Sequence, residues 1–202
     1  MYKYLLLIIF AFSNLDSFSQ ERTMKQKYVQ LTDTSFQGFV NWCVYHGLDS
    51  ALYNHNFPPL IASNSYTSAL LNYDSLKPIV FYNFWFITCH PCVDEMPMFN
   101  SLAKQYTDSI DFIAITFDYQ EDVKEFLKTH PFNFLHFTMA RSYLDELRII
   151  RGYPTTIITY HNKIIYCIHG GMTSGSKYYE AVMKESEKNY KSILDSLLNI
   201  RY

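Results

Sequence analysis

The chain has 202 residues, a length that fits one domain of ordinary size with some additional sequence. Hydrophobic residues make up 49% and charged residues 18%, which excludes a chain that is disordered throughout. The formal net charge of -2 gives no basic footprint for nucleic acid, and the nucleotide motifs GxGxxG and GxxxxGK[ST] are absent. Four cysteines are too few for a disulfide scaffold at this length, so their positions must explain them.

Residues 1–19 are predicted to be a signal peptide. Lys3 supplies a weak positive charge, Leu5–Phe12 is a short apolar run, and Ser17 and Ser19 provide small residues at a cleavage site. The apolar run is too short to cross about 30 Å of hydrocarbon; the alternative is a buried N-terminal helix. We therefore expect an exported, periplasmic protein that is soluble after cleavage and is not stably inserted in a membrane.

Residues 20–56 are expected to form an N-terminal extension. Apolar residues between Phe36 and Val44 recur at helical spacing, which favours a short helix there. The prolines that follow Phe57 mark a natural boundary. Residues 57–202 are therefore expected to form the main domain.

The main domain is predicted to alternate strands and helices. Ile79–Phe86 is an almost uninterrupted apolar and aromatic run, typical of a strand buried on both faces. After it we expect a helix over about 90–106, a strand over 110–117, a helix over 121–129, a strand over 133–139, a helix over 142–150, a hairpin of strands 155–160 and 164–168, a break at 170–171 and a final helix over about 179–197. This order predicts an α/β layered domain.

Two cysteines stand at CxxC spacing where the buried strand gives way to a helix. The unpaired N–H groups and the positive dipole end of that helix favour a thiolate, so Cys89 is the predicted nucleophile. Cys92, one turn further along and less exposed, is the predicted resolving thiol. Pro91 suits a first helical turn, and His90, if protonated, would add a second charge that stabilises the thiolate.

Two alternatives to a redox pair are weaker. A zinc site needs a second pair of ligands, and Cys43 and Cys167 are isolated in the sequence, so no metal is expected. A purely structural disulfide that closes so short a loop would add little stability through loop-closure entropy. Cys43 and Cys167 are themselves either buried free thiols or a structural disulfide that ties the N-terminal segment to the sheet.

Residues far from the cysteine pair carry a family resemblance. Pro154 enters a strand after Gly152, which makes it a candidate for a cis peptide bond. The motifs are Asn83-Phe84-Trp85, Cys89-His90-Pro91-Cys92, Pro97 and Gly152-Tyr153-Pro154-Thr155-Thr156. Together they resemble the thioredoxin superfamily, and more narrowly the exported TlpA/ResA-like thiol-disulfide oxidoreductases, from about Phe57 to the C-terminus. The resemblance implies a thioredoxin-like fold, with a central mixed sheet flanked by helices and a strand–helix insertion within Ile110–Met139.

The resemblance also implies roles for individual residues. Cys89 matches the attacking cysteine and Cys92 the resolving one. Pro154 matches the cis-proline that faces the disulfide, and Tyr153 before it would present its backbone to an extended substrate segment. Glu95 matches an acidic residue that accepts the Cys92 proton; the alternative for Glu95 is a solvated helix charge.

Three further positions bear on the match. Trp85 corresponds to the aromatic residue packed under the site, and Pro97 to the proline that kinks the helix. Asn83 stands where cytosolic thioredoxins carry a buried Asp. Thr88 departs from the Trp that precedes the first cysteine in thioredoxins, and this changes the expected partner contacts around Cys89.

The implied function is an exported enzyme that reduces protein disulfides by dithiol–disulfide exchange through Cys89 and Cys92, without a cofactor. Its partners would be protein disulfide or thiol clients and an upstream thiol electron donor. His90 favours the opposite direction, a protein-thiol oxidant, because groups that stabilise the thiolate make the couple more oxidising. A copper-binding chaperone of the same fold is a further alternative, which the tight CxxC spacing and Pro154 disfavour. An interaction module without chemistry is disfavoured by the intact cysteine pair.

Overall fold

The computed structural model describes residues 35–45 and 47–200. They divide into two compact units, with the boundary after Tyr45, and each unit is described by itself. The first contains helix α2 (Phe36–Tyr45), where helical spacing predicts it. The predicted signal peptide lies outside the described residues. Within the described residues, no helix has the length and apolar character needed to span a membrane.

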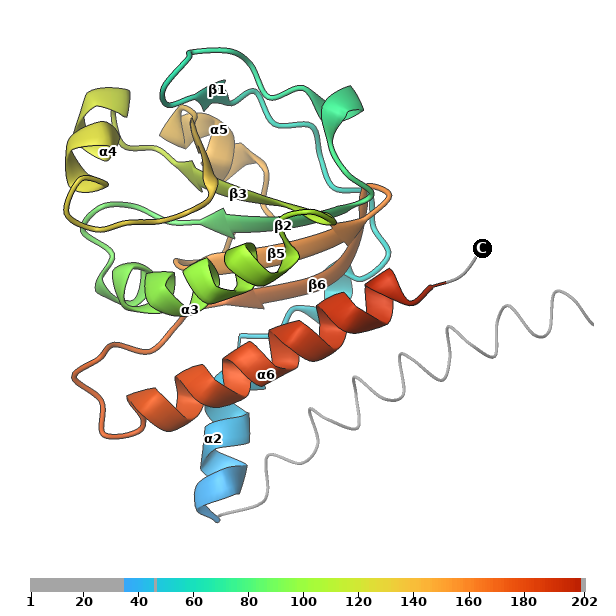
Figure 1. The fold of residues 1–202 in the computed structure, drawn as a ribbon, viewed down its shortest axis with the longest axis vertical. Coiled ribbons are helices and arrows are strands. Elements are labelled where there is room, and N and C mark those ends of the chain that lie inside the picture. Colours follow the sequence, from blue (N-terminus) through green and yellow to red (C-terminus); the bar gives the residue numbers. More distant parts are fainter. Residues whose placement is uncertain (1–34, 46, 201–202) are drawn as a thin grey trace, which may run out of the picture. The chain divides into compact units, whose positions relative to one another are not determined.

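The second unit is built on a six-stranded mixed sheet in the order β1-β4-β3-β2-β5-β6 (Figure 1). The strands are β1 (Ser63–Asn64), β2 (Ile79–Phe84), β3 (Ile110–Thr116), β4 (Leu135–Thr138), β5 (Thr155–Tyr160) and β6 (Lys163–His169). Strand β3 runs parallel to β2 and β4, whereas β5 runs antiparallel to β2 and β6, and β1 antiparallel to β4. The expected mixed sheet is confirmed, and the range Ile110–Met139, in which an insertion is expected, contains β3, α4 (Gln120–Phe126) and β4.

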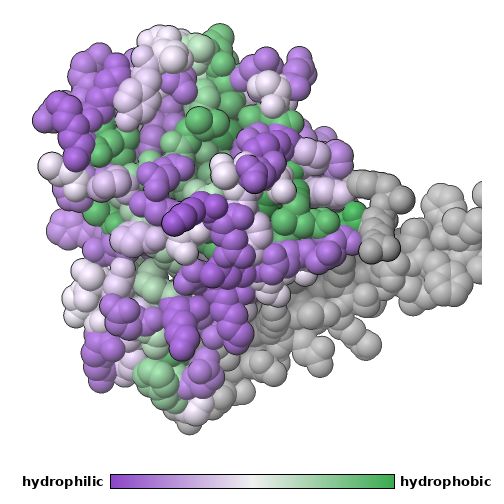
Figure 2. All heavy atoms as spheres, in the orientation of Figure 1, coloured by the Kyte–Doolittle hydropathy of each residue, from purple (hydrophilic) through white to green (hydrophobic). Residues whose placement is uncertain are grey.

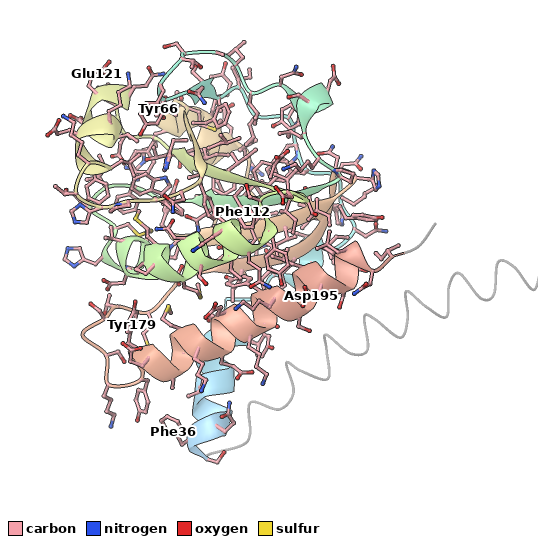
Figure 3. The ribbon with its side chains drawn as sticks, in the orientation of Figure 1. Phe36, Tyr66, Phe112, Glu121, Tyr179 and Asp195 are labelled. Carbon is pink, nitrogen blue, oxygen red and sulfur yellow. A yellow bond between two sulfur atoms is a disulfide. The ribbon has the colours of Figure 1, made fainter. Side chains whose placement is uncertain are left out.

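Two long helices lie side by side across one face of the sheet, α3 (His90–Tyr106) and α6 (Tyr179–Leu198) (Figure 1). The Tyr106 hydroxyl of α3 donates a 2.7 Å hydrogen bond to the Asp195 carboxylate of α6, which is labelled in Figure 3. The shorter α5 (Arg141–Glu146) ends earlier than expected, and Arg148 shortly after it has a left-handed φ of 53°. The face of the unit in Figure 2 is largely hydrophilic, with hydrophobic side chains in separate patches.

Strand β2 is buried at all six positions, as its apolar run predicts. Because side chains alternate along a strand, Phe81 points to one face, where its ring lies 5.5 Å from Phe99 of α3 and 5.3 Å from Tyr190 of α6. Tyr82 points to the other face and stacks at 4.2 Å on Phe57. Many of the aromatic side chains therefore fill the layers above and below the central strand.

Part of the segment 20–56 lies against the edge strand β6. The backbone N–H of His169 donates to the Gly47 carbonyl (2.9 Å), and the backbone N–H of Asp49 donates to the Cys167 carbonyl (2.8 Å). A Cβ atom at Gly47 would stand 1.6 Å from the His169 carbonyl oxygen, so only glycine permits this approach. The 3-10 turn η2 (Ser50–Leu52) follows, with Asp49 as its N-cap.

Candidate active site

The structure places the two CxxC cysteines at the start of α3, joined by a disulfide with a Cα–Cα distance of 5.3 Å. Cys89 is the N-cap residue, and Pro91 lies in the first turn, where its missing N–H leaves no acceptor unpaired. The side chains of both cysteines are buried. A thiolate released at Cys89 by reduction would therefore face the N-terminal amides of the helix.

The residue predicted to underlie the site, Trp85, immediately follows β2 and is fully buried. Its ring lies 5.7 Å from Phe126 and 5.9 Å from Phe132, and its backbone N–H donates to the Ile115 carbonyl (3.0 Å). Asn83, two residues earlier, is buried and donates its amide to the Thr156 hydroxyl (3.2 Å). These contacts hold the strand end from which the active-site turn departs.

Pro154 immediately precedes β5, and its peptide bond with Tyr153 is cis. The Gly170 N–H donates to the Pro154 carbonyl (2.7 Å), and the Thr155 hydroxyl donates to the Gly152 carbonyl (2.6 Å). These two bonds fasten the loop 152–155, called here the cis-proline loop, to the end of β6 and to itself.

Tyr153 packs its side chain into an aromatic cluster. The ring lies 5.2 Å from Phe86 and 5.7 Å from Phe117, and Arg141 stands 4.8 Å over the Phe117 ring. Burial of the hydroxyl raises the pKa of Tyr153. Because the side chain is committed to this packing, any contact between Tyr153 and a substrate would fall mainly to its backbone.

Glu95 lies one turn after Cys92 on α3 and is only 7% exposed, so its interpretation as a solvated helix charge is wrong. Burial, with a smaller contribution from the neighbouring Asp94 charge, raises the pKa of Glu95 to about 8. The side chain is therefore mostly protonated at neutral pH and becomes a proton acceptor as the pH rises above 8. Such a group suits proton transfer at a thiol.

Gly171, which the sequence pattern indicates only as part of a chain break, is a residue of the site. A Cβ atom there would stand 2.4 Å from a Glu95 carboxylate oxygen and 2.9 Å from Pro154 Cγ. The segment after β6 is held in this place by Asp94, whose carboxylate accepts the Ser174 N–H (2.6 Å) and whose carbonyl accepts the hydroxyl of Tyr179 (Figure 3). Gly171 thus brings together the buried carboxyl of α3 and the cis-proline.

Replacement of Gly171 by alanine is expected to displace either the Glu95 carboxyl or the Pro154 ring, because the added methyl group has no space. We expect a destabilisation of about 1–3 kcal/mol and a fall of about tenfold or more in thiol–disulfide exchange. Urea denaturation and a rate measurement check the two effects. Gly175→Ala is the control for stability, since its Cβ meets nothing within 4 Å. Equal stability of the two variants would contradict the close packing at Gly171.

His90 and Thr88 are exposed beside Cys89 and line a groove of about 560 Å³. Phe126 and His130, near the end of α4, form another part of this groove, and residues 173–175 complete it. The groove therefore lies directly beside the first cysteine and offers space for part of a partner molecule.

Cys43 and Cys167 are both free thiols. Cys167 is buried on β6, where desolvation and the nearby Asp49 charge raise its pKa to about 12, so the group stays a thiol. Cys43 belongs to the other unit. Among the residues that the structure describes, no three His, Cys, Asp or Glu side chains are grouped so that they could hold a metal ion.

Comparison with solved structures identifies the fold. A candidate thiol:disulfide interchange protein DsbE from Chlorobium tepidum superimposes with a TM-score of 0.59, at 21% identity, over 72% of this chain and 97% of that chain. The thioredoxin domain of a thiol-disulfide oxidoreductase from Bacteroides vulgatus gives a TM-score of 0.54, at 17% identity, over 68% and 96% of the two chains. The chain has a thioredoxin-like fold.

Sequence comparison agrees with this fold. The thioredoxin-like protein YneN from Bacillus subtilis is 31% identical over 96 residues, which are 46% of this chain and 56% of that protein. The match therefore spans little more than half of the curated relative. No family model matches the sequence. The predicted resemblance to thioredoxin-like proteins is therefore confirmed, in sequence as well as in fold.

Proposed function

We propose that the protein is an exported thiol-disulfide oxidoreductase that reduces protein disulfides through Cys89 and Cys92, in the manner of the TlpA/ResA-like group. The observation that carries the proposal is the Cys89–Cys92 disulfide at the N-terminus of α3 in a thioredoxin-like fold. A buried carboxyl with a raised pKa, Glu95, lies one turn further along the same helix. Export is proposed from the signal-like sequence of residues 1–19.

The proposed reaction transfers two electrons from the reduced cysteine pair to a client disulfide. The Cys89 thiolate attacks one client sulfur, forms a mixed disulfide and releases the other client sulfur as a thiolate. Cys92 then gives its proton to the ionised Glu95 and attacks Cys89 Sγ, which forms the Cys89–Cys92 disulfide and releases the second client thiolate. The two client thiolates take up protons, and an upstream dithiol donor reduces the enzyme again.

The proposed client is a protein rather than a small disulfide. The groove beside His90 has room for side chains next to the attacked sulfur. In the cis-proline loop, the Tyr153 ring packs against Phe86, so the backbone of Tyr153 is the part that would contact an extended client segment. Backbone pairing of this kind accepts many sequences, because main-chain groups are common to all of them.

The Cys92→Ser variant tests this function. Without the resolving thiol the mixed disulfide cannot be released, so we expect covalent adducts at Cys89 with proteins of the same compartment. Mass spectrometry after non-reducing electrophoresis would identify them, and a thiol reductant should release them. The control is the double variant Cys89→Ala, Cys92→Ser, which should capture nothing. If the single variant also captures nothing, the proposed function is wrong.

The redox potential of the cysteine pair would show whether the protein reduces disulfides or oxidises thiols. The exposed His90 directly follows Cys89 and is the observation that favours an oxidant. We propose reduction and therefore expect a redox potential closer to the value of about −270 mV typical of thioredoxin than to about −120 mV, the value of a strong oxidant. Equilibration with glutathione buffers would measure it, and a value near the second figure would assign the oxidant function.

A further inference from the structure

A buried polar cluster lies directly behind the cis-proline loop. His169 Nδ1 is 2.8 Å from the Thr155 hydroxyl oxygen, and the Thr155 hydroxyl itself donates to the Gly152 carbonyl at 2.6 Å. Since the single hydroxyl proton of Thr155 goes to Gly152, its oxygen must accept the proton of His169 Nδ1. The hydrogen bond therefore runs from β6 into the loop and fixes the tautomer of His169.

The other ring nitrogen of His169 faces a thiol and a carboxylate. Nε2 lies 3.7 Å from Cys167 Sγ and 3.5 Å from Asp49 Oδ2. Burial lowers the pKa of His169, and the hydrogen bond and charge of Asp49 oppose that shift. Close polar contacts therefore connect Cys167 and Asp49, through His169 and Thr155, to Gly152.

Asp49 supports the same loop from a second direction. Its side chain is 5% exposed, and Oδ2 lies 3.1 Å from the guanidinium of Arg151, the residue before Gly152. Its other oxygen, Oδ1, accepts the Ala51 N–H at 3.1 Å and so orients the carboxylate. Asp49 itself is held to β6 by the hydrogen bond from its N–H to the Cys167 carbonyl.

We infer that Asp49 and His169 are positioning residues that hold the cis-proline loop in the geometry that accepts an extended peptide segment of the client. This inference rests on the proposed function. The residues come from three separate parts of the chain, around 49, 151–155 and 167–169, and converge only through the pairing of residues 47–49 with β6. The segment before Phe57 thus supplies part of the support of the site.

Loss of these hydrogen bonds should lower the rate with a protein disulfide much more than the rate with a small disulfide. A protein disulfide such as that of insulin must align its backbone with the loop, whereas a small aromatic disulfide such as DTNB needs only access to Cys89. In His169→Phe, which keeps an aromatic ring but removes both ring nitrogens, we expect the rate with insulin to fall about tenfold, because small misplacements of binding groups have effects of this size. The rate with DTNB should stay within about twofold of wild type. Both rates are measured on the reduced, full-length protein.

Further variants separate positioning from a general loss of structure. His169→Asn places an amide N–H near the position of Nδ1 and should recover most of the insulin rate. Thr155→Val removes the hydroxyl and Asp49→Asn removes the charge, each with little change of shape. Both variants should lower the insulin rate and leave the DTNB rate close to that of wild type. The matched control is Asp111→Asn, which removes an Asp–Lys77 ion pair at the opposite end of β2 and β3 and should leave both rates unchanged. Circular dichroism shows which variants are folded.

The outcomes are distinct. Equal losses with insulin and DTNB, or no loss in the folded variants, would overturn the positioning role. If His169→Phe does not fold, Thr155→Val and Asp49→Asn decide by the same comparison. If the wild-type protein reacts with neither disulfide, the proposed function itself is wrong. If the wild-type protein reacts and the folded variants react equally well, only the positioning role is wrong.

Discussion

Replacement of Cys89 by alanine is expected to abolish thiol–disulfide exchange. Cys89 is the N-cap residue of α3, the position where the helix amides stabilise a thiolate, while Cys92 lies within the helix and is 1% exposed. The remaining thiol therefore cannot take over the attack on a client. The loss of rate should be about a thousandfold or more, as for other nucleophiles whose removal leaves no substitute. The measurement is the single-turnover reduction of insulin by the pre-reduced protein.

Cys43→Ser is the control for that experiment. It removes one of the two free thiols, in the unit that does not contain the CxxC motif, and should react at the wild-type rate. A Cys89→Ala protein that still reduces insulin at a comparable rate would mean that the chemistry belongs to another thiol. The result would then contradict the assignment of Cys89 as the nucleophile.

The second large effect is expected at Glu95. Its carboxyl has a pKa of about 8 in the folded protein against 4.5 as the ordinary value. Between these two pH values the unfolded chain has lost the proton that the folded chain still holds, so the free energy of unfolding falls as the pH rises. The fall is about 1.4 kcal/mol per pH unit and amounts to about 5 kcal/mol in all. It is absent below pH 4.5, and no further loss occurs above pH 8.

Glu95→Gln should remove this pH dependence, because the amide stays neutral. Urea denaturation of the oxidised proteins should show the variant gaining about 4 kcal/mol of stability relative to wild type between pH 5 and pH 9. Glu121→Gln on the exposed side of α4 (Figure 3) is the control and should show no such gain. Parallel pH curves for wild type and Glu95→Gln would contradict a buried carboxyl at this position.

The same variant reports on catalysis. If the Glu95 carboxylate accepts the Cys92 proton, the release of client from the mixed disulfide should accelerate as the pH rises through about 8. In Glu95→Gln that inflection should disappear, with a rate about a hundredfold lower above pH 8. Stopped-flow measurement of the second step separates it from the first attack. A retained inflection near pH 8 would assign the proton acceptor to another group.

Local features of the sequence were sufficient for much of the fold. The apolar run that begins at Ile79 predicts a strand buried on both faces, and the strand forms there because alternate side chains meet α3 on one face and the layer around Phe57 on the other. The positions of the helix ends were predicted less accurately. The helix expected over 142–150 stops at Glu146, because helix ends depend on single backbone conformations such as that of Arg148.

The sequence by itself determined the position of the cysteine pair at a strand–helix junction and the resemblance that points to Pro154, since each of these motifs consists of residues close together along the chain. Only the tertiary structure decided that Glu95 is buried, that Gly171 adjoins it, and that Asp49 and His169 stand behind the cis-proline loop. The physical reason is the same for each. The burial and the hydrogen-bond partners of a polar side chain are set by whatever packs against it, and here those partners come from segments many residues away in the sequence.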